Sequence, residues 1–136
     1  MNPHTPSFIK IMKHPVQFRM FLFTKLPAAF FAVVRVREVD EKRCRVTVPY
    51  KWLSQNPFRS TYFACLSMAA EMSTGALAMA HLYKISPPVS MLVVKVESVY
   101  FKKATSRTSF LCEDGELFLK AIEETIATGE AQTVKA

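Results

Sequence analysis

The stretch from residue 56 to residue 81, NPFRSTYFACLSMAAEMSTGALAMAH, constrains the fold of this chain more than any other part of the sequence. It is long, almost continuously apolar and rich in small residues, and Glu71 is the only charged side chain between Arg59 and Lys84. A helix that is apolar nearly all round either crosses a membrane or is enclosed by protein. The length allows a membrane span, but an acid near the middle and strand-like segments on both sides favour the buried core helix of a soluble domain.

The residues before this helix predict where it begins. Pro57 suits a first helical position, because the N–H that proline lacks has no partner in the first turn of a helix, and Asn56 before it is a favourable N-cap residue. Ser60 or Thr61 is an alternative cap. The sequence therefore leaves the start of the helix open by about one turn.

Segments in which polar and apolar residues alternate flank the central helix. Residues 32–50 alternate around a turn at 40–42, which predicts a β-hairpin with one basic and one apolar face. Residues 89–103 predict a long strand with a bend near Ser98, where the alternation changes phase. Residues 108–113 predict a further strand, antiparallel to it. We therefore expect an α+β fold in which a curved antiparallel sheet wraps the central helix.

The C-terminal part of the chain predicts one more helix. Asp114 is a candidate cap for a helix from Gly115 to Thr128, and Gly129 is a suitable residue to end it. Residues 131–136 have the pattern of the first half of another strand. We expect the C-terminal strand of the domain to be incomplete in this sequence.

Residues 1–30 mix apolar and basic side chains, and we expect them to form a basic amphipathic helical segment ahead of a larger domain at 31–136. Pro15 and Pro27 bracket a candidate helix, and charged residues interrupt the apolar run that a signal peptide would need. Such a helix can lie on a membrane surface or over a ligand entrance. We favour the alternative, a helix packed on the edge of the core, because that is the usual role of an amphipathic stripe.

Composition narrows the class of partner. With 136 residues the chain suits one compact domain, and a formal net charge of +7 favours an anionic partner. Nucleic acid is not expected, because the basic residues are scattered and belong to no recognisable binding motif. Three well-separated cysteines predict buried free thiols in a cytoplasmic protein, and Cys65 has no nearby histidine to activate it. The spacing of Cys and His predicts no metal site.

Glu71 is the candidate catalytic residue of this sequence. Helical spacing places Ser67, Thr74 and His81 near the same stripe of the central helix. One interpretation is that the stripe is simply the hydrated side of the helix. The other is a site, because an acid among Met and Ala side chains would be partly desolvated, as a general base requires. Ser67 and Thr74 are then candidate substrate-binding residues, and His81 is a helix-end histidine.

The order of these elements and the residues around Glu71 resemble the hotdog fold of acyl-CoA thioesterases and dehydratases. In the thioesterases related to phenylacetate degradation, an Asn is followed after a short gap by His-Gly-Gly at the helix start and by Leu-Ala-Asp further in. Without gaps, Asn56 matches the Asn, Tyr62-Phe63-Ala64 matches the His-Gly-Gly, and Ala69-Ala70-Glu71 matches the Leu-Ala-Asp. The string NPFRSTYFACLSMAAE also looks like an uncharacterised, thioesterase-like subgroup of hotdog proteins.

The resemblance implies a homodimer, or a tetramer of paired dimers, with a thioester hydrolase site at the dimer interface. The substrate would be an acyl-CoA or acyl-carrier thioester, with coenzyme A present only as part of the substrate and no separate cofactor. Glu71 would be the general base or nucleophile, Asn56 would position water, and the backbone amides of Tyr62 and Phe63 would stabilise the oxyanion. Because Tyr and Phe replace the family's His and Gly, the alternative is a non-catalytic hotdog protein that binds acyl groups or a partner.

Overall fold

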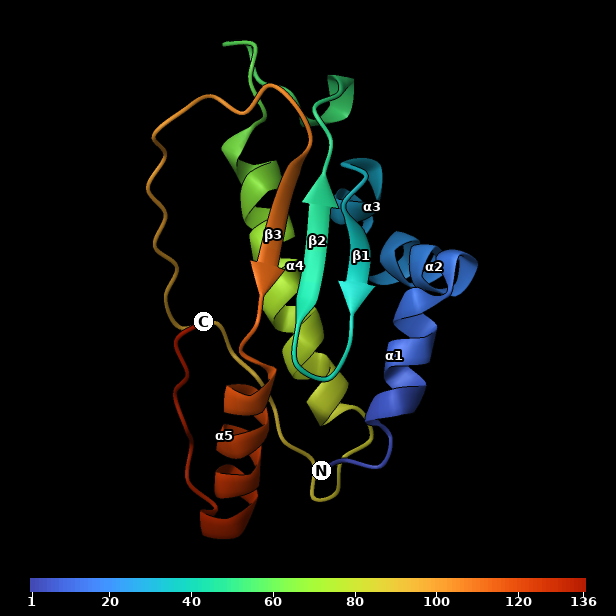
Figure 1. The fold of residues 1–136 in the computed structure, drawn as a ribbon, viewed down its shortest axis with the longest axis vertical. Coiled ribbons are helices and arrows are strands. Elements are labelled where there is room, and N and C mark those ends of the chain that lie inside the picture. Colours follow the sequence, from blue (N-terminus) through green and yellow to red (C-terminus); the bar gives the residue numbers. More distant parts are fainter.

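A long helix, α4 (Phe63–Leu82), lies against one face of a three-stranded antiparallel sheet in the computed structural model, which describes residues 1–136 (Figure 1). The strands are β1 (Arg35–Val39), β2 (Cys44–Val48) and β3 (Thr108–Cys112), and they lie in the order β1-β2-β3. The other elements are α1 (Thr5–Lys13), α2 (Pro15–Lys25), α3 (Pro27–Phe31), a 3-10 turn at Trp52–Ser54 and α5 (Gly115–Thr128). The α+β class, the central helix and the helical amino-terminal segment are confirmed.

Strand β2 is the centre of the sheet, and its alternation fixes the buried face. Cys44, Val46 and Val48 have no exposed surface. Because successive side chains of a strand point to opposite faces, these three residues face the same way, toward α4. Val46 pairs with Val36 of β1 and with Phe110 of β3, so the apolar face continues across all three strands. The predicted hairpin over residues 32–50 is confirmed.

The hydrophobic core forms where this sheet face, α4 and the amino-terminal helices meet. Burial of apolar side chains in this core is the main favourable contribution to folding. Core residues contributed by α1, α2, β1 and α4 include Ile9, Met12, Phe18, Leu22, Val39, Leu66, Ala69, Met72 and Leu77. The small residues of α4 that let other elements approach the helix closely include Ala69 and Ala80, which are completely buried.

Helix α5 packs at the end of the β1–β2 hairpin through Gly115. The amide of Gly115 donates to the carbonyl oxygen of Lys42 at 3.0 Å. A Cβ atom at this position would overlap the backbone of Glu41 and Lys42, so only glycine fits without moving the hairpin. Gly129 ends the helix in the left-handed conformation, as the sequence predicts.

Two predicted strands are absent from the structure. Residues 89–103 and 131–136 lie outside the sheet and have no regular secondary structure. The phase change near Ser98 explains the first difference, because neither side of the segment is apolar along its full length. Lys95 and Glu97, which form an ion pair at 2.7 Å, occupy part of one side. The outer edge of β3 therefore has no neighbouring strand.

Helix α4 is long and apolar enough to cross a membrane by length and composition, and it is the one helix of which this is true. In the fold it packs against β2 and β3 on one side and contacts α5. These contacts are those of a core helix, in agreement with the interpretation of the sequence.

Candidate functional site

Glu71 lies on the exposed side of α4, and the partial burial expected from the sequence is wrong. The side chain is exposed and makes no hydrogen bond or ion pair within the chain. Ser67 and Gly75, four residues before and four residues after it, share this side of the helix. Of its Met and Ala neighbours in the sequence, Ala69 and Met72 are buried in the core, and Met68 and Ala70 are partly exposed.

Gly75 gives the Glu71 carboxylate its position. A Cβ atom at residue 75 would lie 2.7 Å from Oε1 of Glu71, closer than real Cβ contacts. The carboxylate therefore occupies space that a side chain at residue 75, one turn further along the helix, would fill.

The other members of the predicted polar stripe separate in the structure. Ser67 and Thr74 are partly exposed near Glu71, and the Thr74 hydroxyl donates to the backbone carbonyl of Glu71 at 2.9 Å. His81 is 1% exposed on the core side, where its Nε2 lies 2.9 Å from the carbonyl oxygen of Glu41. The stripe predicted from the sequence therefore holds three of the polar residues together and excludes His81.

The start of α4 is one turn or more later than Pro57. Helix α4 begins at Phe63, with Tyr62 as its N-cap residue. The Tyr62 amide donates to the carbonyl oxygen of Ser54 at 2.7 Å, so it is not free to bind an oxyanion. The amides of Phe63 and Ala64 have no hydrogen-bond partner in the chain, as is usual in the first turn of a helix. They are the available oxyanion donors.

Two aromatic rings stand beside these free amides. The rings of Tyr62 and Phe63 pack edge to face with centroids 5.1 Å apart, and the side chains are 46% and 59% exposed. An exposed aromatic pair at a helix start offers an apolar surface next to backbone donors. This combination suits an acyl group whose carbonyl oxygen accepts a hydrogen bond.

Asn56 organises the loop before α4 instead of capping the helix. Its Oδ1 accepts hydrogen bonds from the amides of Phe58 and Ser60 at 2.9 and 3.3 Å, and its Nδ2 donates to the Ser60 hydroxyl at 3.0 Å. This is an Asx-type turn, which competes with helix formation. The bonding explains why the helix does not begin at Pro57.

The structure does not bring the candidate residues together within one chain. Glu71 follows Phe63 by eight residues, which corresponds to about 12 Å along the helix axis. A carboxylate and an oxyanion donor that serve the same carbonyl group must both be within about 3 Å of the reacting atoms. One copy of α4 therefore cannot supply both groups to one substrate.

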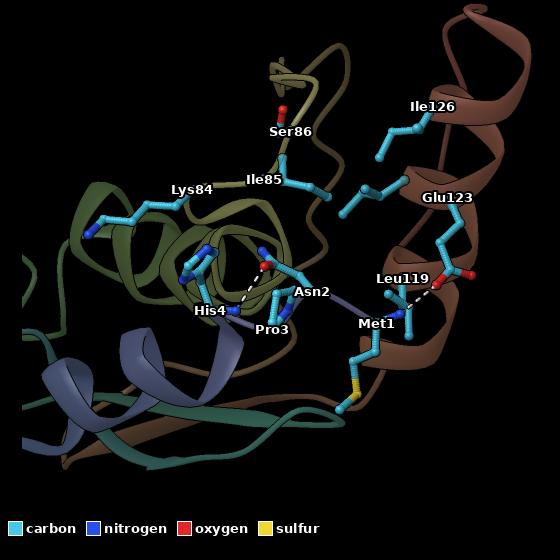
Figure 2. Close-up of a pocket in the computed structure, with 11 residues that line it drawn as sticks. Met1, Asn2, Pro3, His4, Lys84, Ile85, Ser86, Leu119, Glu123 and Ile126 are labelled. Atoms are coloured by element: carbon cyan, nitrogen blue, oxygen red, sulfur yellow. Dashed lines mark hydrogen bonds and ion pairs between the residues drawn. The ribbon is translucent and has the colours of Figure 1, made fainter.

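A separate cavity of about 330 Å³ lies between the amino-terminal residues, the segment after α4 and α5 (Figure 2). Beside it, the buried side chain of Asn2 donates to the carbonyl oxygens of His81 and Tyr83 at 2.9 and 2.8 Å, which caps the C-terminal end of α4. The Glu123 carboxylate at the cavity pairs with the amino group of Met1 at 3.1 Å. The sequence pattern gave no signal for this cap, because the two partners are 79 residues apart.

The three cysteines are free and buried, as predicted. Cys44 of β2 lies directly opposite Cys112 of β3, and burial raises the pKa of Cys44 to about 12. Burial also raises the pKa of Cys65 above its ordinary value. Thiols held in the protonated form are poor nucleophiles, so burial disfavours Cys44 and Cys65 as nucleophiles. No group of three or more His, Cys, Asp or Glu side chains is arranged to hold a metal ion.

Comparisons with known proteins place the fold. A crystal structure of a protein of unknown function from Chlorobaculum tepidum TLS matches with a TM-score of 0.70 and 18% identity, over 86% of this chain and 75% of that one. The crystal structure of genomics APC5556 matches with a TM-score of 0.60 and 18% identity, over 76% of this chain and 71% of that one. A search of the curated proteins finds no match.

The sequence also matches the profile of a protein family. The profile covers residues 16–127, and therefore includes the sheet, α4 and most of α5. The arrangement of a long helix against an antiparallel sheet, shared with the two crystal structures, is that of a hotdog-like fold. The chain belongs to the family of domains of unknown function DUF4442.

Proposed function

We propose that the protein hydrolyses thioesters of the acyl-CoA or acyl-carrier type, at a site formed between two copies of α4. The observation that carries this proposal is the unpaired carboxylate of Glu71 on the exposed side of an otherwise apolar helix. A carboxylate without a hydrogen bond or ion pair is free to act on water or on a thioester.

The other candidate residues take complementary roles. The free amides of Phe63 and Ala64 would polarise the thioester carbonyl, with the helix N-terminus adding its partial positive charge. Asn56 uses one of the two N–H groups of its side chain in the loop, which leaves the other to position water. The hydroxyl of Ser67 has no partner in the chain and the Thr74 hydroxyl can still accept, so both remain candidates for substrate binding.

A twofold axis near Ser67 would complete the site. Ser67 is midway between Phe63 and Glu71, and all three lie on the same side of α4. If two copies of α4 pack antiparallel about that point, Glu71 of one protomer lies opposite the Phe63 amide of its partner. Ser67 and Gly75 are small enough to let two helix backbones approach, and the open edge of β3 offers a second contact.

The first experiment measures thiol release from a panel of acyl-CoA esters, from short aliphatic to long-chain and aromatic. We expect Glu71→Gln to lose hydrolysis because the amide can neither accept a proton nor attack the thioester. Glu124→Gln, which removes an exposed acid of α5, is the matched control. Turnover that is indifferent to Glu71 would exclude this mechanism.

Mixed dimers test whether the site is shared. Phe63→Pro removes one of the two free amides, and proline suits this first helical position because Tyr62 already has the extended ψ of 132° that precedes proline. Phe63→Ala, which keeps the amide, is the control. Mixing Phe63→Pro with Glu71→Gln protomers should restore about a quarter of the original activity, since half of the dimers would carry one intact site. No restoration would contradict a shared site.

The exposed rings of Tyr62 and Phe63 favour one alternative, an acyl-binding protein without catalysis. In that case the rings would bind the acyl group and close the approach to the amides. Calorimetry with a non-hydrolysable thioether analogue of acyl-CoA separates the two functions. Binding that is weakened by Phe63→Ala, together with absence of turnover on every ester, would support the binding protein.

A further inference from the structure

Helix α2 exposes apolar side chains on the side that faces away from the core. Phe18 and Leu22 are buried, at 8% and 2% exposure, and join α2 to the rest of the fold. Val16, Met20 and Phe23 are 63%, 57% and 49% exposed. They are spaced at i, i+4 and i+7, so they form one stripe. The helix is therefore apolar on two sides, and only one of them is covered within the chain.

Aromatic residues of α3 extend this exposed stripe. Phe23 packs against Phe30 and Phe31 with ring centroids 5.1 and 6.3 Å apart, and Phe31 is 53% exposed. The guanidinium of Arg19 lies 5.0 Å from the centre of the Phe30 ring. The exposed apolar surface of α2 and α3 therefore borders the positively charged side chain of Arg19.

Three more arginines gather at the same place. Burial lowers the pKa of Arg35 on β1, and the nearby charges of Arg19, Arg37 and Arg107 lower it further. The strand register agrees: Nε of Arg37 donates to the Thr47 hydroxyl at 2.9 Å, and Thr47 pairs with Arg35 on β1 and with Ser109, two residues after Arg107, on β3. None of these four arginines takes part in an ion pair. The first acidic residue of the chain is Glu38, so no carboxylate of the amino-terminal helices neutralises them.

We propose that this α2–α3 surface, made of Val16, Met20, Phe23, Phe31 and the four arginines, binds the surface of an anionic lipid bilayer. Exposed aromatic and aliphatic side chains would enter the interface, and the arginines would contact lipid phosphates. The proposal goes beyond thioester hydrolysis and does not depend on it.

Charge favours a bilayer over a second copy of the chain. A twofold interface would place the four arginines of one protomer against the same four of its partner, and these like charges would repel. Nucleic acid would match the charge, but it would leave Val16, Met20 and Phe31 without an apolar environment. In addition, α2 and α3 lie on the β1 side of the sheet, away from the open edge of β3 (Figure 1). Pairing of chains at that edge would leave the apolar side chains of α2 and α3 accessible.

Flotation of the full chain with phosphatidylcholine vesicles, with and without phosphatidylglycerol, tests the proposal. We expect binding only when phosphatidylglycerol is present and less binding at high salt, because salt screens the attraction. Replacing two arginines, Arg19→Gln with Arg107→Gln, should weaken binding roughly 30-fold. Lys120→Gln with Lys135→Gln has the same net charge but alters the α5 side of the chain, and it should bind as the unaltered protein does.

A second pair of substitutions tests the apolar stripe. Val16→Asp with Met20→Asp changes two highly exposed side chains, so the fold should be retained, and circular dichroism and thermal unfolding check this. Loss of vesicle binding with an unchanged sedimentation coefficient would support the proposal. The proposal would be overturned if the unaltered chain did not bind, or if the lysine control lost binding equally. A change of oligomeric state in the aspartate variant would also overturn it, because the stripe would then join two copies of the chain.

Discussion

The carboxylate of Glu71 lies over Gly75, one turn further along α4, and a Cβ atom there would come within 2.7 Å of Oε1. The nearest atoms to that position all belong to the Glu71 side chain. Space for the carboxylate on the helix surface therefore depends on one glycine in the middle of a long helix, where glycine is intrinsically unfavourable.

Gly75→Ala should stabilise the protein and impair the site. Alanine is favoured over glycine in a helix interior by about 1 kcal/mol, and only a flexible side chain has to move. The added methyl group would displace the Glu71 carboxylate, so thioester hydrolysis should fall. Urea unfolding and acyl-CoA turnover measure the two effects. In a Glu71→Gln background the same substitution should stabilise without any further loss of activity, and a further loss would contradict this explanation.

The buried Cys44 thiol should make the protein less stable at alkaline pH. Its pKa is about 12 in the fold against 9.0 for an ordinary thiol, because burial disfavours the thiolate. Above pH 9 the unfolded chain releases the proton and the folded chain keeps it. The stabilisation is thus complete below pH 9 and is lost as the pH rises toward 12, at up to about 1.4 kcal/mol per pH unit.

Cys44→Ala isolates that contribution. Urea unfolding of both proteins at pH 7 gives the cost in stability of the smaller side chain, since the Cys44 thiol is protonated there in both the folded and the unfolded chain. Repeating the measurement at pH 9 and above should then show a shallower fall in stability for the variant. Parallel curves for the two proteins would mean that another group causes the alkaline destabilisation.

The fold was predictable where a pattern is local. The hairpin, α2 and α5 each carry their own alternation, prolines or caps within a few residues, and the central helix is apolar over many turns. Residues 89–103 were not predictable in the same way, because a strand also needs a partner and a continuous apolar side. Their alternation indicates an extended segment, which the structure shows, but not its place in a sheet.

The candidate site was predictable as a set of residue types and not as a geometry. The spacing correctly placed Ser67 and Thr74 beside Glu71. The prediction that Asn56 caps the helix was wrong, because the turn that Asn56 forms in the loop competes with the cap. Which side of α4 is covered depends on α1, α5 and the sheet, all distant in sequence, so the exposure of Glu71 and the burial of His81 could not be read from a helical period alone.

Gly115→Ala should destabilise the protein by about 3 kcal/mol, because the added methyl group would overlap the backbone of the β1–β2 hairpin, which cannot rotate away as a side chain can. Thermal unfolding measures the cost. Glu116→Ala, at the next position, removes only a highly exposed ion pair with Lys42 and should leave stability almost unchanged. Equal stability of the two variants would show that the hairpin and α5 move apart easily.

Asn2→Asp should be at least as destabilising as Asn2→Ala, although it is nearly the same shape as asparagine. Both substitutions remove the Nδ2 donor that binds the carbonyl oxygens of His81 and Tyr83, and a lost partner of a buried acceptor costs about 1–3 kcal/mol. Aspartate keeps the oxygen that accepts from the His4 amide, yet it turns a negative oxygen toward those two carbonyls at the negative end of the α4 dipole. Urea unfolding of the two variants decides the point: if aspartate were tolerated and alanine were not, the side chain would act through the His4 turn and not as the cap of α4.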